Sequence, residues 1–373
     1  MTVGADLANS KAMNRTLFSL ILVGAGLAVG GFENGDGVPP PPEKEWAARN
    51  AAFVRAKIFR TEAFSASAIN FGVDPNSGAI DPKRTTCKYK PDDVSGTTPK
   101  FDCVLENGDK VKVKYGNTKE IPSEIAASRL MHALGFGADK VSRVESVRCY
   151  GCPFQPFHTR SLWELIGLTG FMDKRLDYDR YRDFDGVSVE RNLEGEAIEA
   201  GDERGWAFYE LKKIDPAQGG ATRAEVDALR LMAVFLHHWD NKSANQRLMC
   251  PDSKSADCKH PLAMIQDVGS DFGPKKVELE TWGSKPVWAD DASCRVTMKW
   301  MPYNGGTFED TTISEDGRRL LGDRLKQLSH AQIEALFTAA GLEDVPAWVS
   351  TFEDKVRQIV DRPSCPVMTR TSS

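Results

Sequence analysis

Two short polar motifs in the second half of the chain contain the residue types that phosphoryl transfer requires. Asp240, Lys242 and Asn245 lie together in the segment DNKSAN, and Asp267 and Gly269 follow in the segment QDVG. An acid can orient an attacking hydroxyl group, a lysine can stabilise charge on the transferred phosphoryl group, and carboxylate or amide oxygens can bind magnesium. Asp240, Lys242, Asn245 and Asp267 could together supply these functions.

An amphipathic helix is expected immediately before the first of these motifs. Apolar residues recur at helical spacing over residues 223–238 and give the helix one apolar face. Asp or Asn after a helix is also common in simple turns and caps. His237 and His238 do not indicate a metal site, because neighbours on a helix point about 100° apart. Two further helices are expected, one after the capping box Ser329 to Gln332 and one over residues 347–360.

The region from Cys87 to Val147 has the pattern of strands around one helix. Residues 101–105 and 110–115 flank Asn107-Gly108, which predicts a β-hairpin with a type I′ turn, since both central residues of that turn need positive φ. The second strand reads KVKVK, so its three lysines share one face. A helix closed by Gly135 and a strand over residues 141–147 are expected to follow.

The order of these motifs resembles that of the protein-kinase-like superfamily. HHWDNKSAN is similar to the catalytic-loop motif HRDLKxxN, and MIQDVG is similar to the strand that leads into the metal-binding DFG motif. SGTTPKF (residues 95–101) is similar to the short phosphate-binding loop of HipA-type bacterial kinases, a divergent branch related to phosphatidylinositol kinases and secretory-pathway kinases. The resemblance covers residues 85–340 and implies an α+β fold with two lobes. A small β-rich N-lobe and a larger helical C-lobe would hold ATP and magnesium between them.

The resemblance assigns roles to the residues of the two polar motifs. Asp240 resembles the catalytic base, and Lys242 resembles the lysine beside the γ-phosphate. Asn245 and Asp267 resemble the two metal ligands. Trp239 stands where these kinases commonly have Arg, and the chain has no G-x-G-x-x-G loop.

The resemblance also indicates nucleotide-binding residues in the first half of the chain. One lysine of the KVKVK strand should reach the α- and β-phosphates, and Lys114 is preferred to Lys112. Glu124, at the start of the next helix, resembles the acid that pairs with this lysine. Gly96 and Lys100 lie in the segment that resembles the phosphate-binding loop.

The N-terminus has the pattern of an export signal. Lys11 and Arg15 precede the apolar run from Leu17 to Val29, and small residues follow, which predicts a signal peptide over residues 1–30. An uncleaved anchor is the alternative, although a spanning helix needs about 20 apolar residues. A Gly/Pro-rich linker is expected over residues 31–42.

The eight cysteines are consistent with an oxidising compartment. An even number of cysteines in an exported protein predicts up to four disulfides, and pairing between sequence neighbours is the simplest arrangement. The C-x-x-C pair of Cys149 and Cys152 could instead be a redox pair, or could form a zinc site with Cys250 and Cys258.

Composition and pattern together give the expected domain organisation. We expect a helical addition over residues 43–86, a kinase-like N-lobe over 87–152 and a C-lobe over 153–365. Residues 173–204 contain 11 acidic and six basic residues and are expected to form a solvated insertion in the C-lobe. The formal net charge of −5 and the absence of a basic stripe argue against binding to nucleic acid.

These features predict an extracytoplasmic phosphotransferase that depends on ATP and magnesium and uses an alcohol group as acceptor. A protein is the first expectation for the acceptor. A kinase for a small molecule or sugar is the second reading, and a catalytically inactive secreted pseudokinase that acts as a binding scaffold is the third. The expected partners are a nucleotide and an unidentified acceptor, with no membrane contact beyond the export signal. The protein would be secreted, periplasmic or in the lumen of the secretory pathway.

Overall fold

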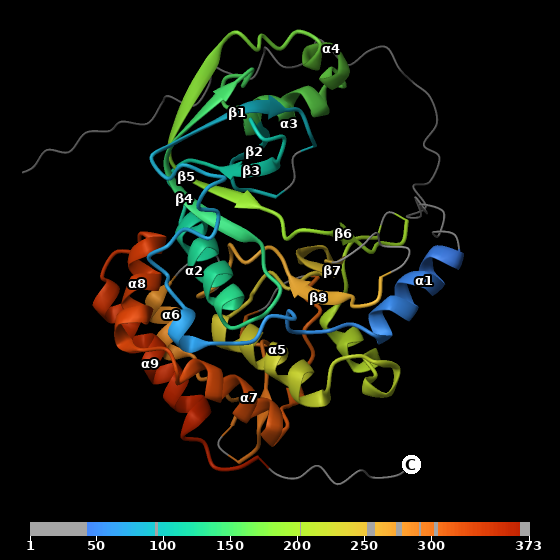
Figure 1. Ribbon diagram of the computed structural model, residues 1–373, viewed down its shortest axis with the longest axis vertical. Coiled ribbons are helices and arrows are strands. Elements are labelled where there is room, and N and C mark those ends of the chain that lie inside the picture. Colours follow the sequence, from blue (N-terminus) through green and yellow to red (C-terminus); the bar gives the residue numbers. More distant parts are fainter. Residues whose placement is uncertain are drawn as a thin grey trace, which may run out of the picture. The chain divides into compact units, whose positions relative to one another are not determined.

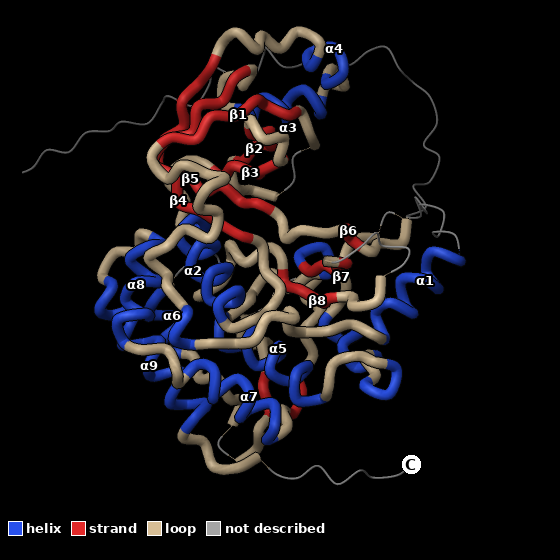
Figure 2. Tube along the Cα trace, in the orientation of Figure 1, coloured by secondary structure: helices blue, strands red, loops and turns tan. Residues whose placement is uncertain are grey.

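The computed structural model describes residues 43–93, 96–201, 203–251, 258–273, 278–290, 292–301 and 305–365. The predicted signal peptide over residues 1–30 and the linker over residues 31–42 lie outside the described residues. Among the described residues, no helix has both the length and the apolar character needed to cross a membrane. Within residues 41–373, which form one unit, strands dominate the first part and helices the second (Figures 1 and 2). The prediction of an α+β fold with a β-rich N-lobe and a larger helical C-lobe is confirmed.

The N-lobe contains a closed barrel of five strands in the order β1-β2-β3-β5-β4. Neighbouring strands run antiparallel except β1 and β4, which pair in parallel and close the barrel. Apolar side chains and cysteines form the N-lobe core, and they alternate with polar residues along the strands. The strands are β1 (Arg84–Lys90), β2 (Lys100–Leu105), β3 (Lys110–Lys114), β4 (Lys140–Tyr150) and β5 (Tyr181–Arg191).

Strand β5 lies in the acid-rich segment, residues 173–204, for which the sequence predicted a solvated insertion of the C-lobe. In the structure, β5 occupies the barrel between β3 and β4, so the strands of the N-lobe extend to Arg191. The first half of β5 is mostly exposed, whereas residues Val187 to Glu190 are buried. The many charges of this segment therefore belong in part to the exposed end of a barrel strand.

The predicted hairpin of β2 and β3 is present, but its turn is not of type I′. Gly108 has a positive φ of 89°, whereas Asn107 does not. The side-chain oxygen of Asn107 instead accepts a hydrogen bond of 3.0 Å from the backbone N–H of Asp109. Asn107 thus stabilises the loop through its side chain, without adopting the left-handed conformation.

Helix α2 (Glu120–Ala133) follows β3 and contacts both the barrel strand β4 and the C-lobe helix α8 (His330–Ala340). It begins two residues before Pro122 and is followed by Gly135, whose φ is 87°. Most of its residues are buried, including the carboxylates of Glu120 and Glu124. Helix α2 therefore holds two buried carboxylates where the barrel meets the C-lobe.

The C-lobe is mainly helical, and α5 (Arg223–Leu236) lies in its apolar core. Thr222 and Glu225 form a capping box at the start of α5, and the predicted capping box of Ser329 and Gln332 starts α8. The sheet β6-β7-β8 lies near the boundary of the two lobes (Figure 1). The other elements are α3 (Pro156–Leu165), α4 (Thr169–Asp173), β6 (Glu196–Ala197), β7 (Gln246–Cys250), β8 (Leu262–Ile265), α6 (Leu279–Ser284), β9 (Arg295–Val296), β10 (Thr311–Thr312), α7 (Glu315–Leu325) and α9 (Val345–Val360).

The region before the barrel is less helical than the sequence predicted. Helix α1 (Glu43–Val54) is the only α-helix in the described residues 43–86, where the sequence predicted a helical addition. The carbonyls of Val54 and Ala56 accept hydrogen bonds from the N–H groups of Asp215 and Ala221. The chain leaves the helix here because it pairs with the backbone of the C-lobe.

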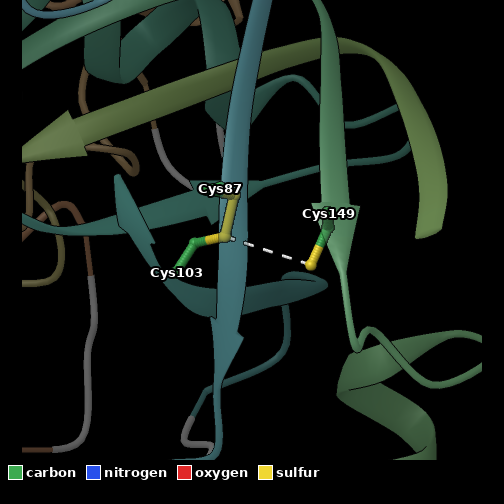
Figure 3. Close-up of side chains that lie close together, drawn as sticks. All are labelled: Cys87, Cys103 and Cys149. Carbon is green, nitrogen blue, oxygen red and sulfur yellow. Dashed lines mark hydrogen bonds between the residues drawn. A yellow bond between two sulfur atoms is a disulfide. The ribbon is translucent and has the colours of Figure 1, made fainter. Parts of the chain in front are cut away.

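All eight cysteines are among the described residues, and all are in disulfides. The bonds join sequence neighbours, as the simplest predicted pairing required: Cys87–Cys103, Cys149–Cys152, Cys250–Cys258 and Cys294–Cys365. Figure 3 shows that Cys149 lies beside the first of these bonds, 3.9 Å from the sulfur of Cys103. These three sulfur atoms lie close enough together to bind one metal ion. Zinc binds thiolates, however, and cysteines in disulfides cannot supply them. The zinc alternative is therefore not supported.

The four disulfides should contribute unequally to stability. Cys294–Cys365 spans 71 residues and Cys250–Cys258 spans eight, while all four cysteines are buried. Restriction of the unfolded chain grows with loop length, so replacing the first pair by serine should cost about 2 kcal/mol more than replacing the second. Urea unfolding of the two double variants measures this difference. Equal losses of stability in the two double variants would contradict this prediction.

Candidate active site

A cavity of about 820 Å³ lies between the barrel and the β7–β8 hairpin. Its lining contains most of the residues that the sequence predicted for a phosphotransferase site. Lys114 and Glu124 are buried behind the cavity wall. Lys114 contacts Asp267, which lines the cavity, and Glu124 contacts Lys114. The predicted residues in the lining are Gly96, Lys100, Lys112, Asp240, Lys242, Asn245 and Asp267.

The lysines of β3 differ in depth, although they share one face of the strand. The exposed fraction of the side chain is 42% for Lys110, 32% for Lys112 and 2% for Lys114. The ammonium of Lys114 lies 2.6 Å from Oε1 of Glu124 and 2.9 Å from Oε1 of Glu120. It also lies 3.5 Å from Oδ1 of Asp267. The structure thus brings together the lysine, the helix acid and the aspartate that were predicted from three separate motifs.

The charges around Lys114 are unequal in number, because three carboxylates share one ammonium group. Burial alone would lower the pKa of Lys114, but Asp267, Glu124 and Glu120 raise it well above its ordinary value. Burial raises the pKa of Glu124 to about 8 against the attraction of Lys114. Asp267 and Asn245 line the cavity with a carboxylate and an amide oxygen, which are ligands that magnesium accepts, so the residues present fit a magnesium site.

Asp267 and Glu120 both line the cavity, and Asp267 is the more exposed carboxylate, with 39% of its side chain exposed against 9% for Glu120. Burial would raise its pKa, but Lys114, Lys112 and Lys100 together hold the pKa well below its ordinary value. Asp267 is therefore ionised at neutral pH, which is the state that a metal ligand needs.

The segment Asp240 to Asn245 is held against Asp267 by backbone pairing. The register of β7 with β8 places Gln246 opposite Ile265. Just before it, the backbone carbonyl of Asn245 accepts hydrogen bonds from the N–H groups of Gln266 (2.8 Å) and Asp267 (3.3 Å). The side-chain amide of Asn245 donates to the backbone carbonyl of Asp240 at 2.6 Å. The hairpin thereby fixes both polar motifs at one edge of the cavity.

Asp240 has one carboxylate oxygen engaged and one available. Its Oδ2 lies 3.1 Å from the ammonium of Lys242, whereas Oδ1 has no hydrogen-bond partner among the described residues. Oδ1 itself is buried, but 18% of the Asp240 side chain is exposed and the residue lines the cavity, so its carboxylate can meet a ligand there. The geometry is suitable for orienting an incoming hydroxyl group.

The loop before β2 brings a third lysine to the site. Gly96 has a φ of 78°, and a side chain there would begin 3.2 Å from the ammonium of Lys100. Lys100 pairs with Lys114 in the register of β2 and β3. Burial and the nearby charges of Lys114 and Lys112 lower the pKa of Lys100, despite the opposite effect of Asp267. Anionic phosphate groups would stabilise such a cluster of ammonium groups.

Lys112 has a separate partner that the sequence did not predict. Its ammonium lies 2.9 Å from Oε1 of Glu190, a buried residue of β5. The β3–β5 register places these two residues directly opposite each other. This ion pair explains why Lys114 and Lys112 have different surroundings although both lie in the KVKVK strand.

Glu120 is a second residue that the sequence analysis missed. It precedes Glu124 by one helical turn, and this i, i+4 spacing of two acids was the available signal. The hydroxyl of Thr98 donates a hydrogen bond to its Oε2. A side chain at Gly269 would collide with the Cγ of Glu120. The glycine of the D-x-G motif therefore permits the close approach of α2.

Asp271 is a further acid beside the site, and it begins the sequence Asp271-Phe272-Gly273. It is fully buried, and its Oδ1 lies 2.9 Å from Nδ1 of His238. Burial raises the pKa of Asp271 to about 6 against the opposing effect of His238. Asp271 does not line the cavity, so Asp267 is the acid of this segment that can reach a ligand there.

Barrel, helix α2, helix α5, polar loop, β7–β8 hairpin and helical lobe follow one another in the order that the resemblance to the protein-kinase-like superfamily predicted. No protein-family model matches the sequence, and no curated protein matches it. The solved structure of the Helicobacter pylori proinflammatory kinase CtkA is similar, with a TM-score of 0.41, 12% identity, and coverage of 76% of this chain and 97% of that chain. The structure of the Golgi casein kinase is also similar, with a TM-score of 0.35, 11% identity, and coverage of 91% and 94%.

Proposed function

We propose that the protein transfers a phosphoryl group from ATP to a hydroxyl group, with a protein as acceptor, in an oxidising extracytoplasmic compartment. The observation that carries this proposal is the contact of buried Lys114 with both Glu124 and Asp267, because Asp267 lines the same cavity as Asp240. Four disulfides support an oxidising compartment.

Each group of the site has a defined part in the proposed reaction. Lys114 would bind the α- and β-phosphates, and Glu124 would hold its ammonium in place. Lys100, with Gly96 beneath it, would contact the phosphates from the loop. Magnesium, held by Asp267 and Asn245, would neutralise charge on the phosphates.

The acceptor side of the reaction depends on the loop before β7. The carboxylate of Asp240 would accept the hydrogen bond of the acceptor hydroxyl and so orient it for attack on the γ-phosphate. Lys242, 3.1 Å from the same carboxylate, would stabilise charge on the transferred group.

Binding of Mg-ATP is the first test. A ligand that binds only the native state stabilises it by RT ln(1 + [L]/Kd), which is about 2.7 kcal/mol at 100 times Kd. The melting temperature of oxidised protein should therefore rise with Mg-ATP, and Asp267→Asn should remove the magnesium-dependent part of this shift.

Asp271→Asn is the matched control for Asp267→Asn, because both aspartates lie in the same segment and only Asp267 lines the cavity. The control should retain a magnesium-dependent shift relative to its own melting temperature without ligand. Loss of the shift in Asp271→Asn alone would reverse the assignment of the ligand. No shift in the wild type at millimolar nucleotide would favour the scaffold reading.

A further inference from the structure

Exposed apolar side chains are concentrated at the part of the N-lobe that contains α3 and α4. Eight of the ten large apolar residues that are exposed among the described residues lie between positions 154 and 181. We call these eight residues the α3–α4 patch. Its members are Phe154, Leu162, Leu165, Ile166, Leu168, Phe171, Tyr178 and Tyr181.

The patch is built on elements that contact one another. Leu162, Leu165 and Ile166 have the i, i+3, i+4 spacing of one face of α3 and the residue that caps it. Helix α3 contacts α4, where Phe171 lies. Phe154 and Tyr181 line one further pocket on the barrel side. In Figure 1, α3 and α4 lie at the end of the barrel away from the helices of the C-lobe.

The size of the patch exceeds what an isolated protein normally leaves exposed. The exposed fractions run from 41% for Tyr178 to 83% for Leu165. With about 200 Å² for a large side chain, the eight residues expose roughly 900 Å². The largest apolar patch on a typical monomer is about 300 to 600 Å², whereas a stable interface buries about 800 Å² on each partner. The area therefore fits one side of a protein interface.

The composition and charge of this surface favour a protein partner over a lipid bilayer. Interfaces are rich in Phe, Tyr and Arg, and here Arg175 lies 3.9 Å from the ring centroid of Phe171 and Arg182 lies 5.3 Å from that of Phe154. Residues 154–182 contain five arginines or lysines and four acids. A surface close to neutral does not attract anionic lipid, which requires a cluster of cations. It also does not repel a second copy of itself.

We propose that the α3–α4 patch is the interface of a homodimer in which the same surface of two copies meets across a two-fold axis. An isologous contact needs a self-complementary surface, and the aromatic rings of this patch, with Arg175 and Arg182 beside two of them, can pack on their copies in a second chain. The proposal does not depend on the phosphotransfer activity, because the patch and the cavity share no residue.

The test is the molar mass of the oxidised protein in solution, measured by sedimentation velocity over a range from about 1 to 100 µM. The wild type should sediment with twice the mass of one chain. Leu165→Asp and Phe171→Asp should each raise the dissociation constant at least about 100-fold, because a carboxylate would be desolvated without a partner. Leu165 is 83% exposed, so its substitution should leave the circular dichroism spectrum unchanged.

Val73→Asp is the matched control, because Val73 is 54% exposed and lies outside the patch. It should dimerise as the wild type does. A monomeric wild type at the highest concentration would overturn the proposal, as would a dimer that Leu165→Asp and Phe171→Asp leave intact. Binding of a monomeric wild type to phosphatidylserine-containing vesicles, lost in Leu165→Asp, would identify a lipid surface as the occupant instead.

Discussion

Asp240→Asn should preserve folding and Mg-ATP binding while lowering turnover by about 100-fold or more, the scale expected of a positioned general base. The amide is nearly isosteric with the carboxylate and can keep a polar atom near Lys242, 3.1 Å away. It lacks the negative charge that makes the carboxylate of Asp240 a strong acceptor for a hydroxyl group in the cavity. The measurement is transfer of labelled phosphate from ATP, beginning with autophosphorylation and continuing with candidate acceptor proteins.

Two further variants make this experiment specific. Asp316→Asn replaces an exposed acid of α7 that does not line the cavity, and it should retain wild-type turnover. Lys114→Met should instead weaken nucleotide binding, because it removes the ammonium between Glu124 and Asp267. If the wild type transfers phosphate and Asp240→Asn does so at the same rate, the assignment of Asp240 is wrong.

The contact between Lys114 and Glu124 could be anticipated because the resemblance to kinases implied it and the local sequence allowed it. Alternation in KVKVK places the lysines on one face, and a helix must follow closely behind the strand. The spacing alone did not select the acid, because Glu120, six residues from Lys114, also pairs with it. The proximity of Asn245 and Asp267 follows in the same way from one hairpin, β7–β8.

The missed contacts depend on pairings between distant parts of the chain. Glu190 reaches Lys112 only because β5 enters the barrel, and these residues are separated by 78 positions. The high density of charges in residues 173–204 concealed this strand, since charge is typical of solvated loops. The choice between Asp267 and Asp271 likewise depends on which carboxylate turns toward His238, and no sequence pattern specifies that.

Lys355 is a buried cation beneath the proposed catalytic loop, and it is the clearest destabilising group of the described C-lobe. It lies on α9 with no exposed surface, and no carboxylate of the described residues forms an ion pair with it. Its ammonium donates to the backbone carbonyl of Lys285 at 2.8 Å and lies 3.4 Å from Nε2 of His237. His237 caps α5 in the left-handed conformation, three residues before Asp240.

Burial lowers the pKa of Lys355 from 10.5 to about 7, and burial together with Lys355 and Lys285 lowers the pKa of His237 well below its ordinary value. Between pH 7 and pH 10.5 the unfolded chain holds a proton that the folded chain has released. The free energy of unfolding should therefore rise with pH across this window, and below it the destabilisation by Lys355 is complete.

Lys355→Met should consequently stabilise the protein at pH 7. The mutation removes the cost of burying the ammonium but also loses the hydrogen bond to Lys285, which leaves a net gain of about 3 kcal/mol in the free energy of unfolding. The gain should shrink as the pH approaches 10.5, the ordinary pKa of lysine, because the unfolded wild type then also loses its proton. Thermal and urea unfolding at several pH values measure both effects. Lys44→Met, at an exposed position of α1, should change stability little at any of them. A gain that is independent of pH would contradict the assignment to Lys355 titration, and a loss of stability at pH 7 would show that its hydrogen bond outweighs the cost of burying its charge.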